Sequence, residues 1–166
     1  MLTQKGYDVK KQNVSFGILH DGLKVDIIPA RKHEGHTNYH SIYVSKTNSW
    51  KITNIQLHIQ LVKDSGRIDE IKLAKIWSKL HNLDFPSFYL ELSVIEALKG
   101  RSKDQLDLNF QHVLADLSTE LISRRVVDPA NSNNIISESL TDDEKRVISR
   151  NAEDGYRAPG WNGVIW

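Results

Sequence analysis

The chain has 166 residues and a formal net charge of +1, because 22 lysines and arginines are balanced by 21 aspartates and glutamates. This near-neutral charge gives no bulk electrostatic reason to expect nucleic-acid binding, so an anion site would need a local cluster of cations. The chain has no cysteine, which excludes disulfides and cysteine zinc sites and is typical of cytoplasmic proteins. No apolar run approaches the ~20 residues of a membrane span, and the N-terminus does not resemble a signal peptide.

The first third of the chain has the alternating pattern of β-strands. Residues 13–19 (NVSFGIL) and 23–30 (LKVDIIPA) flank the turn-forming residues 20–22 (HDG), which predicts a hairpin. The polar residues 30–40 predict a loop, and residues 41–53 (SIYVSKTNSWKIT) predict a second hairpin. The N-terminal part is therefore expected to consist of antiparallel strands.

Asp26 lies in the second predicted strand, on the face opposite Val25 and Ile27. Its apolar neighbours predict a buried position, where an ionised carboxylate costs several kcal/mol unless a cation or hydrogen bonds compensate its charge. A divalent metal is one such compensation, since Mg²⁺ is usually held by one or two carboxylates together with substrate phosphates. The alternative is an edge-strand acid that faces solvent, which is the commoner situation of an aspartate in a strand.

From residue 53 onward the pattern has helical spacing. Four helices are expected over residues 53–66, 68–82, 86–100 and 106–124, and a fifth begins at a capping box formed by Thr141 and Glu144. Strands followed by helices indicate an α+β fold.

Two of the helices have apolar residues at spacings that can share one face. In the second helix these are Ile68, Ile71, Ile76, Trp77 and Leu80. In the fourth they are Phe110, Val113, Leu114, Leu117 and Leu121. We expect both faces to be buried.

Candidate phosphate-binding and base-stacking residues lie in the second and third helices. Lys72, Lys75 and Lys79 recur every three to four residues, which is typical of a solvated face but would also allow one lysine to hold a phosphate. Ser87 lies at the start of a helix, where it can cap the helix or meet an anion. Phe88 is either a core aromatic residue or a platform for a nucleobase.

Four segments, taken in order, resemble motifs of nucleotidyltransferases of the DNA polymerase β-like superfamily, in the oligoadenylate-synthetase-like branch that includes bacterial cyclic-oligonucleotide synthases. KVDIIPA is similar to the strand that carries the third metal-binding carboxylate, which assigns Asp26. IKLAKIW is similar to the helix with a triphosphate-binding lysine, which assigns Lys75. PSFYLEL is similar to the helix that contacts base and phosphates, which assigns Phe88 and Ser87. VVDPANSNNI resembles a structural turn built on an aspartate and an asparagine.

The resemblance implies an α+β protein in which residues 1–52 are the C-terminal part of the catalytic palm and residues 53–166 are a helical nucleotide-binding domain. It implies a cytoplasmic enzyme of antiviral defence that transfers a nucleoside monophosphate from an NTP, expected to be ATP, to a hydroxyl group. Asp26 would be a catalytic residue and a ligand of the Mg²⁺ cofactor. Lys75 and Ser87 would hold the triphosphate, and Phe88 would stack on the base.

One part of the family pattern is missing. The family has a Gly-Ser turn followed by Asp-x-[Asp/Glu], but this sequence has no Gly-Ser dipeptide, and its sole Asp-x-Glu is Asp142–Glu144 in the capping box. Two-metal catalysis needs several ligands, and one aspartate does not supply them. We therefore expect the C-terminal portion of a nucleotidyltransferase, inactive alone, whose partner is a segment carrying the other carboxylates. The alternative is a non-catalytic nucleotide-binding or partner-binding module.

Overall fold

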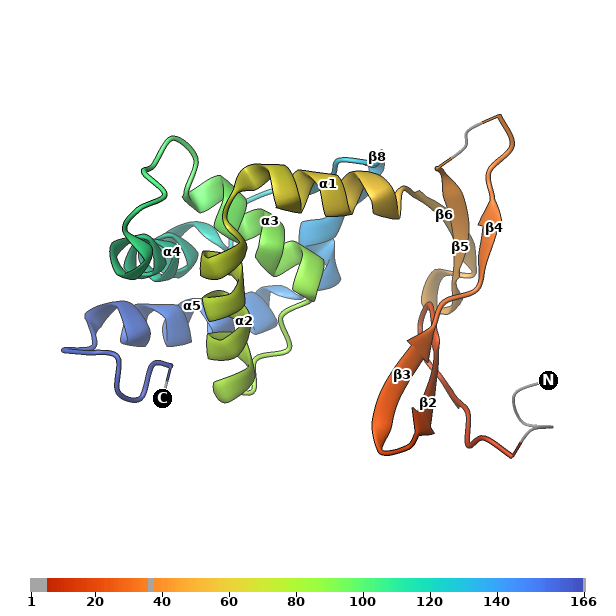
Figure 1. The fold of residues 1–166 in the computed structure, drawn as a ribbon, viewed down its shortest axis with the longest axis horizontal. Coiled ribbons are helices and arrows are strands. Elements are labelled where there is room, and N and C mark those ends of the chain that lie inside the picture. The colour runs from red at the N-terminus through yellow and green to blue at the C-terminus, as the bar shows by residue number, and fades with distance from the viewer. Residues whose placement is uncertain (1–5, 36–37, 166) are drawn as a thin grey trace. The chain divides into compact units, whose positions relative to one another are not determined.

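The computed structural model of the chain describes residues 6–35 and 38–165. Contacts divide the chain into two compact units, Met1–Leu57 and His58–Trp166, which we call the sheet unit and the helical unit (Figure 1). The predicted domain boundary after residue 52 falls at the end of the last strand of the sheet unit, whereas the contacts divide the chain a few residues later, inside the first helix. The functions predicted for the two domains remain predictions.

The first hairpin forms as predicted. A three-stranded antiparallel sheet has the order β1 (Lys10–Lys11), β2 (Phe16–His20) and β3 (Leu23–Ile27). Asp21 and Gly22 join β2 to β3 with φ values of 49° and 78°, as expected for a two-residue hairpin turn that matches the twist of its strands. The short strand β1 was not predicted, since two lysines carry no strand pattern of their own.

The second hairpin also forms, and a third strand that was not predicted pairs with it. β5 (His40–Val44) and β6 (Ser49–Thr53) pair in antiparallel fashion across the short 3-10 helix η2 (Ser45–Thr47). β4 (Ala30–Lys32) pairs with β5, so the predicted loop over residues 30–40 is wrong at its beginning. Those three residues become a strand because of backbone pairing with a distant segment, which their side chains do not reveal.

The predicted burial around Asp26 is wrong. All five residues of β3 are exposed, and the exposed fractions of Val25, Ile27 and Ile28 are 38%, 37% and 47%. β3 is an edge strand of its sheet, and only Ile18 and Val44 are buried hydrophobic residues among those described in the sheet unit. An exposed carboxylate keeps its hydration, so the burial argument for a metal at Asp26 does not hold.

In the part of the chain that the structure describes, the segment from Ile55 onward forms five α-helices and a small hairpin, and the first helix begins just before the helical unit. The elements are α1 (Ile55–Ser65), α2 (Ile68–Leu80), α3 (Ser87–Ala97), α4 (Leu106–Glu120), β7 (Val127–Asp128), β8 (Asn131–Ile135), the 3-10 helix η3 (Ile136–Ser139) and α5 (Asp142–Arg157). Among the described residues, no helix has the length and apolarity to cross a bilayer.

Local signals set several helix ends. The Asn54 side chain accepts a hydrogen bond from the amide of Leu57 at 3.1 Å, which caps α1. The predicted capping box of α5 is present, since Thr141 and Glu144 exchange side-chain and backbone hydrogen bonds. Gly100 lies beyond the end of α3 with a φ of 75°, the left-handed conformation that glycine adopts most readily.

One of the two predicted apolar faces is confirmed and the other is only partly right. The five predicted residues of the α4 stripe, Phe110 to Leu121, are all buried. In α2, Ile71 and Trp77 are buried but Ile68, Ile76 and Leu80 are exposed. The face that α2 buries is Glu70, Ile71, Ala74, Trp77 and Ser78. At 100° per residue Ile76 is turned ~200° from Ala74, so it points away from this face.

A buried ion pair joins α2 to two other segments. Arg67 and Glu70 are both buried, and Arg67 Nη1 donates to Glu70 Oε1 at 3.0 Å. Arg67 also donates to the carbonyl oxygens of Leu98, Arg101 and Ser102, in the loop after α3. Asn109 of α4 donates to Glu70 Oε1 at 3.0 Å. The Arg67 charge is therefore fully compensated inside the unit, as a buried charge requires.

Replacing Glu70 with alanine should destabilise the helical unit by about 3–5 kcal/mol, because it leaves the Arg67 guanidinium buried without its counter-ion. Denaturant unfolding followed by the fluorescence of the buried Trp77 would measure this loss. Asp69→Ala is the matched control: Asp69 lies next to Glu70 but is exposed and pairs only with Lys72, so its loss should stay within about 0.5 kcal/mol. Equal losses in the two variants would contradict the role given to Glu70.

Candidate nucleotide-binding site

Asp26 is held by a neutral side chain. Gln12 Nε2 donates to Asp26 Oδ1 at 2.9 Å, and Ser15 Oγ donates to Gln12 Oε1 at 2.8 Å. Gly17 lies opposite Asp26 on β2. Among the described residues, no three histidines or acids lie close enough together to hold a metal ion. Asp26 can therefore supply one ligand, but the described residues do not fit a complete magnesium site.

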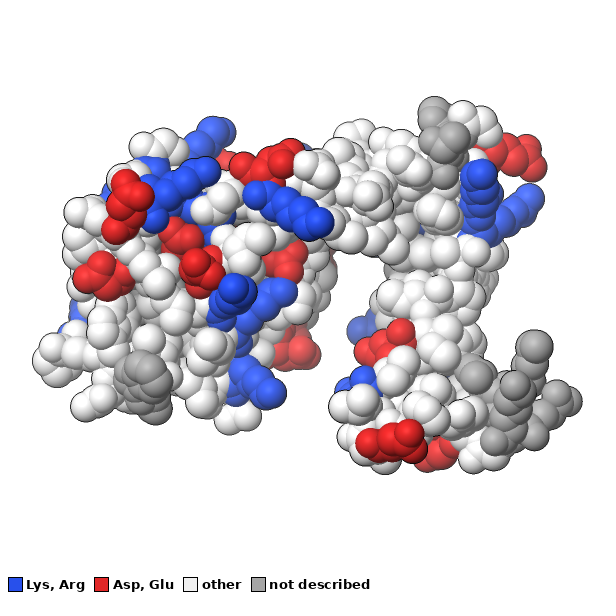
Figure 2. Space-filling model, viewed as in Figure 1, with Lys and Arg blue, Asp and Glu red and all other residues white. Residues whose placement is uncertain are grey.

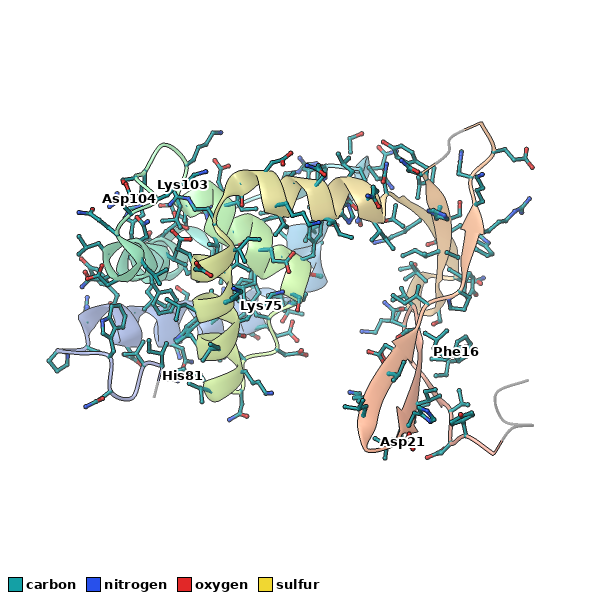
Figure 3. The ribbon with its side chains drawn as sticks, viewed as in Figure 1. Phe16, Asp21, Lys75, His81, Lys103 and Asp104 are labelled. Atoms are coloured by element: carbon teal, nitrogen blue, oxygen red, sulfur yellow. The ribbon has the colours of Figure 1, made fainter. Side chains whose placement is uncertain are left out.

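The three lysines of α2 differ in their surroundings. Lys75 pairs with Glu91 of α3, and its side chain is 41% exposed. Lys72 pairs with Asp69 on its own helix at 3.0 Å, and its side chain is 67% exposed. Lys79 is exposed. Lys75 is thus the lysine that reaches a neighbouring helix, and it is the one that the resemblance assigns (Figure 3).

The start of α3 lies beside Lys75. Glu91 is three and four residues after Phe88 and Ser87, so the three side chains share one face of the helix. Helical side chains lean toward the helix N-terminus, which directs Glu91, and with it the ammonium group of Lys75, toward the first turn. No side chain caps the start of α3, so the amide groups of that turn remain available to an anion.

The two aromatic residues of PSFYLEL have different positions. Tyr89 is fully buried in the core, and burial raises the pKa of its hydroxyl, while the Arg124 guanidinium acts in the opposite direction. Phe88 is half-buried and stacks on His58 of α1, with ring centroids 4.1 Å apart and an angle of 28° between the planes. Phe88 is therefore the aromatic residue available to a ligand.

His58 was missed from the sequence, because a single histidine in IQLHIQ carries no recognisable signal. Its Nε2 lies 2.7 Å from Asp128 Oδ1. An ionised carboxylate only accepts hydrogen bonds, so Nε2 carries the proton and donates. His58 thereby links α1 and the ring of Phe88 to the turn between β7 and β8.

Asp128 and Asn134 have the structural role that their turn motif implies. Asn134 Nδ2 donates to Asp128 Oδ2 at 3.0 Å, and the Ala130 amide donates to Asp128 Oδ1 at 2.8 Å. Asp128 is buried, and burial alone would raise its pKa. The hydrogen bonds from His58, Asn134 and the Ala130 amide outweigh burial and hold the pKa of this carboxyl below its ordinary value.

Three of the four predicted site residues thus lie together in the helical unit: Lys75, Ser87 and Phe88. The fourth, Asp26, belongs to the sheet unit. On the face of the helical unit drawn in Figure 2, acidic and basic side chains are interspersed. A local site built on Lys75 is therefore more consistent with this surface than an extended basic patch.

The comparisons with known proteins rest on structure. No family model and no curated protein matches the chain. Two structures of CdnC from E. coli MS115-1 match 95% of this chain at 20% sequence identity. The TM-score is 0.71 for CdnC in a complex with HORMA-deltaN and 0.66 for CdnC with ATP.

The chain has the fold of CdnC. The match confirms the predicted α+β arrangement of strands followed by helices, and it confirms, for the fold, the resemblance to bacterial cyclic-oligonucleotide synthases. The chain spans 64% of the length of the CdnC chains that it matches.

Asp128→Asn tests the electrostatics of the turn. Because the folded-state pKa lies below the ordinary value of 3.8, the ionised carboxylate stabilises the fold above about pH 5, and this contribution is lost as the pH falls through the folded-state pKa. We expect the variant to be about 2 kcal/mol less stable than the wild type at pH 7. Urea unfolding at pH 7, 5 and 3 should show this difference shrinking only at the lowest pH; a difference that grows toward pH 3 would contradict the assigned sign.

Proposed function

We propose that this chain is the nucleotide-holding portion of a metal-dependent nucleotidyltransferase, which transfers a nucleoside monophosphate from an NTP to a hydroxyl group in oligonucleotide or cyclic-nucleotide synthesis. Two findings support the proposal. The fold matches CdnC over 95% of the chain, and one of the matching structures is CdnC with ATP. In the helical unit, Lys75 pairs with Glu91, which lies on the face of α3 that also carries Ser87 and Phe88.

The ion pair between Lys75 and Glu91 is the observation that carries the proposal. It ties a cation to Glu91, on the face of α3 that also carries Ser87 and Phe88, and a helix N-terminus with a lysine near it favours phosphate. In this proposal Lys75 and Ser87 bind the triphosphate of ATP, and Phe88 stacks on the base. Glu91 keeps Lys75 in place when no nucleotide is bound and competes with the phosphates for it.

Asp26 is proposed as a catalytic residue and as one carboxylate ligand of Mg²⁺ in the complete enzyme, where the ion would neutralise the charge of the transferred phosphoryl group. The described residues offer no second and third ligand beside it, so no step of the reaction is assigned to the ion here. The partner that we propose is a protein segment with the remaining carboxylates. CdnC in its complex with HORMA-deltaN is consistent with a protein partner for this fold. From the family resemblance we also propose that the activity belongs to cytoplasmic antiviral defence.

A second candidate is a non-catalytic module that binds a nucleotide or a protein. The observation in its favour is that the described residues assemble no metal site. A nucleotide-binding module would bind ATP as the first candidate does and would differ from it in that the complete protein does not turn ATP over, whereas a protein-binding module would not bind ATP.

ATP binding should depend on Lys75. Titration calorimetry of the 166-residue chain with ATP should show binding that weakens about tenfold or more in Lys75→Ala, since a charge-assisted hydrogen bond contributes about 1.5–3 kcal/mol. Lys72→Ala is the matched control, because Lys72 lies on the same helix but pairs with Asp69 in solvent; it should bind as the wild type does. Glu91→Gln should bind ATP more tightly, since it releases Lys75.

Two results would contradict the nucleotide site. One is an absence of ATP binding by the wild-type chain at millimolar nucleotide. The other is an equal loss of affinity in Lys75→Ala and Lys72→Ala, which would assign the effect to net charge.

The isolated chain should not sustain catalysis. We expect no pyrophosphate release from NTPs with Mg²⁺ by the purified 166-residue chain, because Asp26 alone cannot hold the metal ions that phosphoryl transfer needs. A coupled pyrophosphate assay measures this directly, with Asp26→Ala as the blank. Steady release by the wild-type chain that Asp26→Ala abolishes would show that the chain holds a complete metal site.

A further inference from the structure

The ring of Phe88 stacks on the ring of His58, with the ring centroids 4.1 Å apart and the planes 28° from parallel. Phe88 is only half-buried, so part of its side chain is accessible to a ligand. An aromatic side chain in the first turn of a helix has several rotamers available, and a stacked neighbour selects one of them.

His58 is itself fixed from a third element. Its Nε2 donates to Asp128 at 2.7 Å, and Asp128 is held in turn by Asn134 and by the amide of Ala130. A chain of contacts therefore runs from the β7–β8 turn through α1 to α3, and it ends at the ring of Phe88. Every member of this chain belongs to the helical unit.

Charge distinguishes the two sides of the site. Asp128 is a buried anion next to the imidazole, whereas Lys75 supplies a cation beside the first turn of α3. Phosphates are repelled at the Asp128 side and attracted at the Lys75 side. The nucleobase, which is flat and uncharged, is therefore the part of a nucleotide that can stack on Phe88.

We propose that His58, fixed by Asp128, is a positioning residue that stacks on Phe88 and orients its ring for contact with a nucleobase. This inference rests on the proposed nucleotide-binding function and deepens it: His58 contributes to affinity for the base, and Lys75 contributes to affinity for the phosphates. His58 acts through Phe88 and does not contact the nucleotide itself.

The test compares two probes, ATP and inorganic tripolyphosphate, by titration calorimetry of the full 166-residue chain. His58→Gln keeps a donor for Asp128 but removes the ring, and it should weaken ATP binding about tenfold, since stacking of a base on an aromatic residue contributes about 1–3 kcal/mol. It should leave tripolyphosphate binding unchanged. His58→Phe keeps a flat ring and should stay within about threefold of the wild type for ATP. Lys75→Ala should weaken both probes.

Gln60→Ala is the control on the same helix, since Gln60 is exposed and bonds only to Asp64; it should bind both probes as the wild type does. Unchanged ATP affinity in His58→Gln would overturn the role of His58 and leave the proposed function intact. An equal loss for both probes in His58→Gln would also overturn it, because the effect would then be on the fold. If the wild-type chain binds neither probe, the proposed function itself is wrong. This result is distinct from a failure of the role of His58 alone.

Discussion

The buried guanidinium of Arg67 is the constraint on which the helical unit depends. A charge in the interior is tolerated only if it is paired and hydrogen-bonded, and both terminal nitrogens of Arg67 meet this condition with Glu70 and three backbone carbonyl groups after α3. The same Glu70 accepts from Asn109, so α4 is tied in as well. The network fixes the rotation of α2, because Glu70 must point inward.

That rotation determines which α2 residues reach the neighbouring helices. With Glu70, Ala74 and Trp77 inside, Lys75 lies at the edge of the buried face, where its side chain reaches Glu91. Lys72 lies farther round the helix and stays in solvent. The difference between two lysines three residues apart thus follows from the packing of α2. Sequence spacing alone places them in one row.

Helix α3 contributes to both the core and the candidate site. Tyr89, Leu90 and Val94 are buried, while Glu91 pairs with Lys75. The mixed composition of this helix explains why sequence could indicate both a core role and a binding role for its aromatic pair. The structure divides the pair, with Tyr89 in the core and Phe88 on His58.

Local patterns were predictable from the sequence, and non-local ones were not. The α5 capping box and the α4 stripe depend on residues within one or two turns of each other, so spacing alone revealed them. The strand β4 exists through pairing with β5, and the burial of Glu70 depends on Asn109 of α4 and on the carbonyl groups after α3 that bind its partner Arg67. His58 was overlooked for the same reason: its partner Asp128 is 70 residues away. Family motifs supplied Lys75, Ser87 and Phe88, which residue patterns alone left undecided.

Because β3 is exposed, burial no longer supports the assignment of Asp26 as a metal ligand. A buried carboxylate would by itself call for a cation, but Asp26 is hydrated and accepts a hydrogen bond from a neutral amide, so its charge costs little where it stands. Its assignment now depends on the motif and the shared fold. The proposed nucleotide site does not depend on Asp26, because Lys75, Ser87 and Phe88 belong to the helical unit, which has its own core. Binding of ATP and metal-dependent turnover therefore report on different parts of the chain, and failure of the second would not weaken the case for the first.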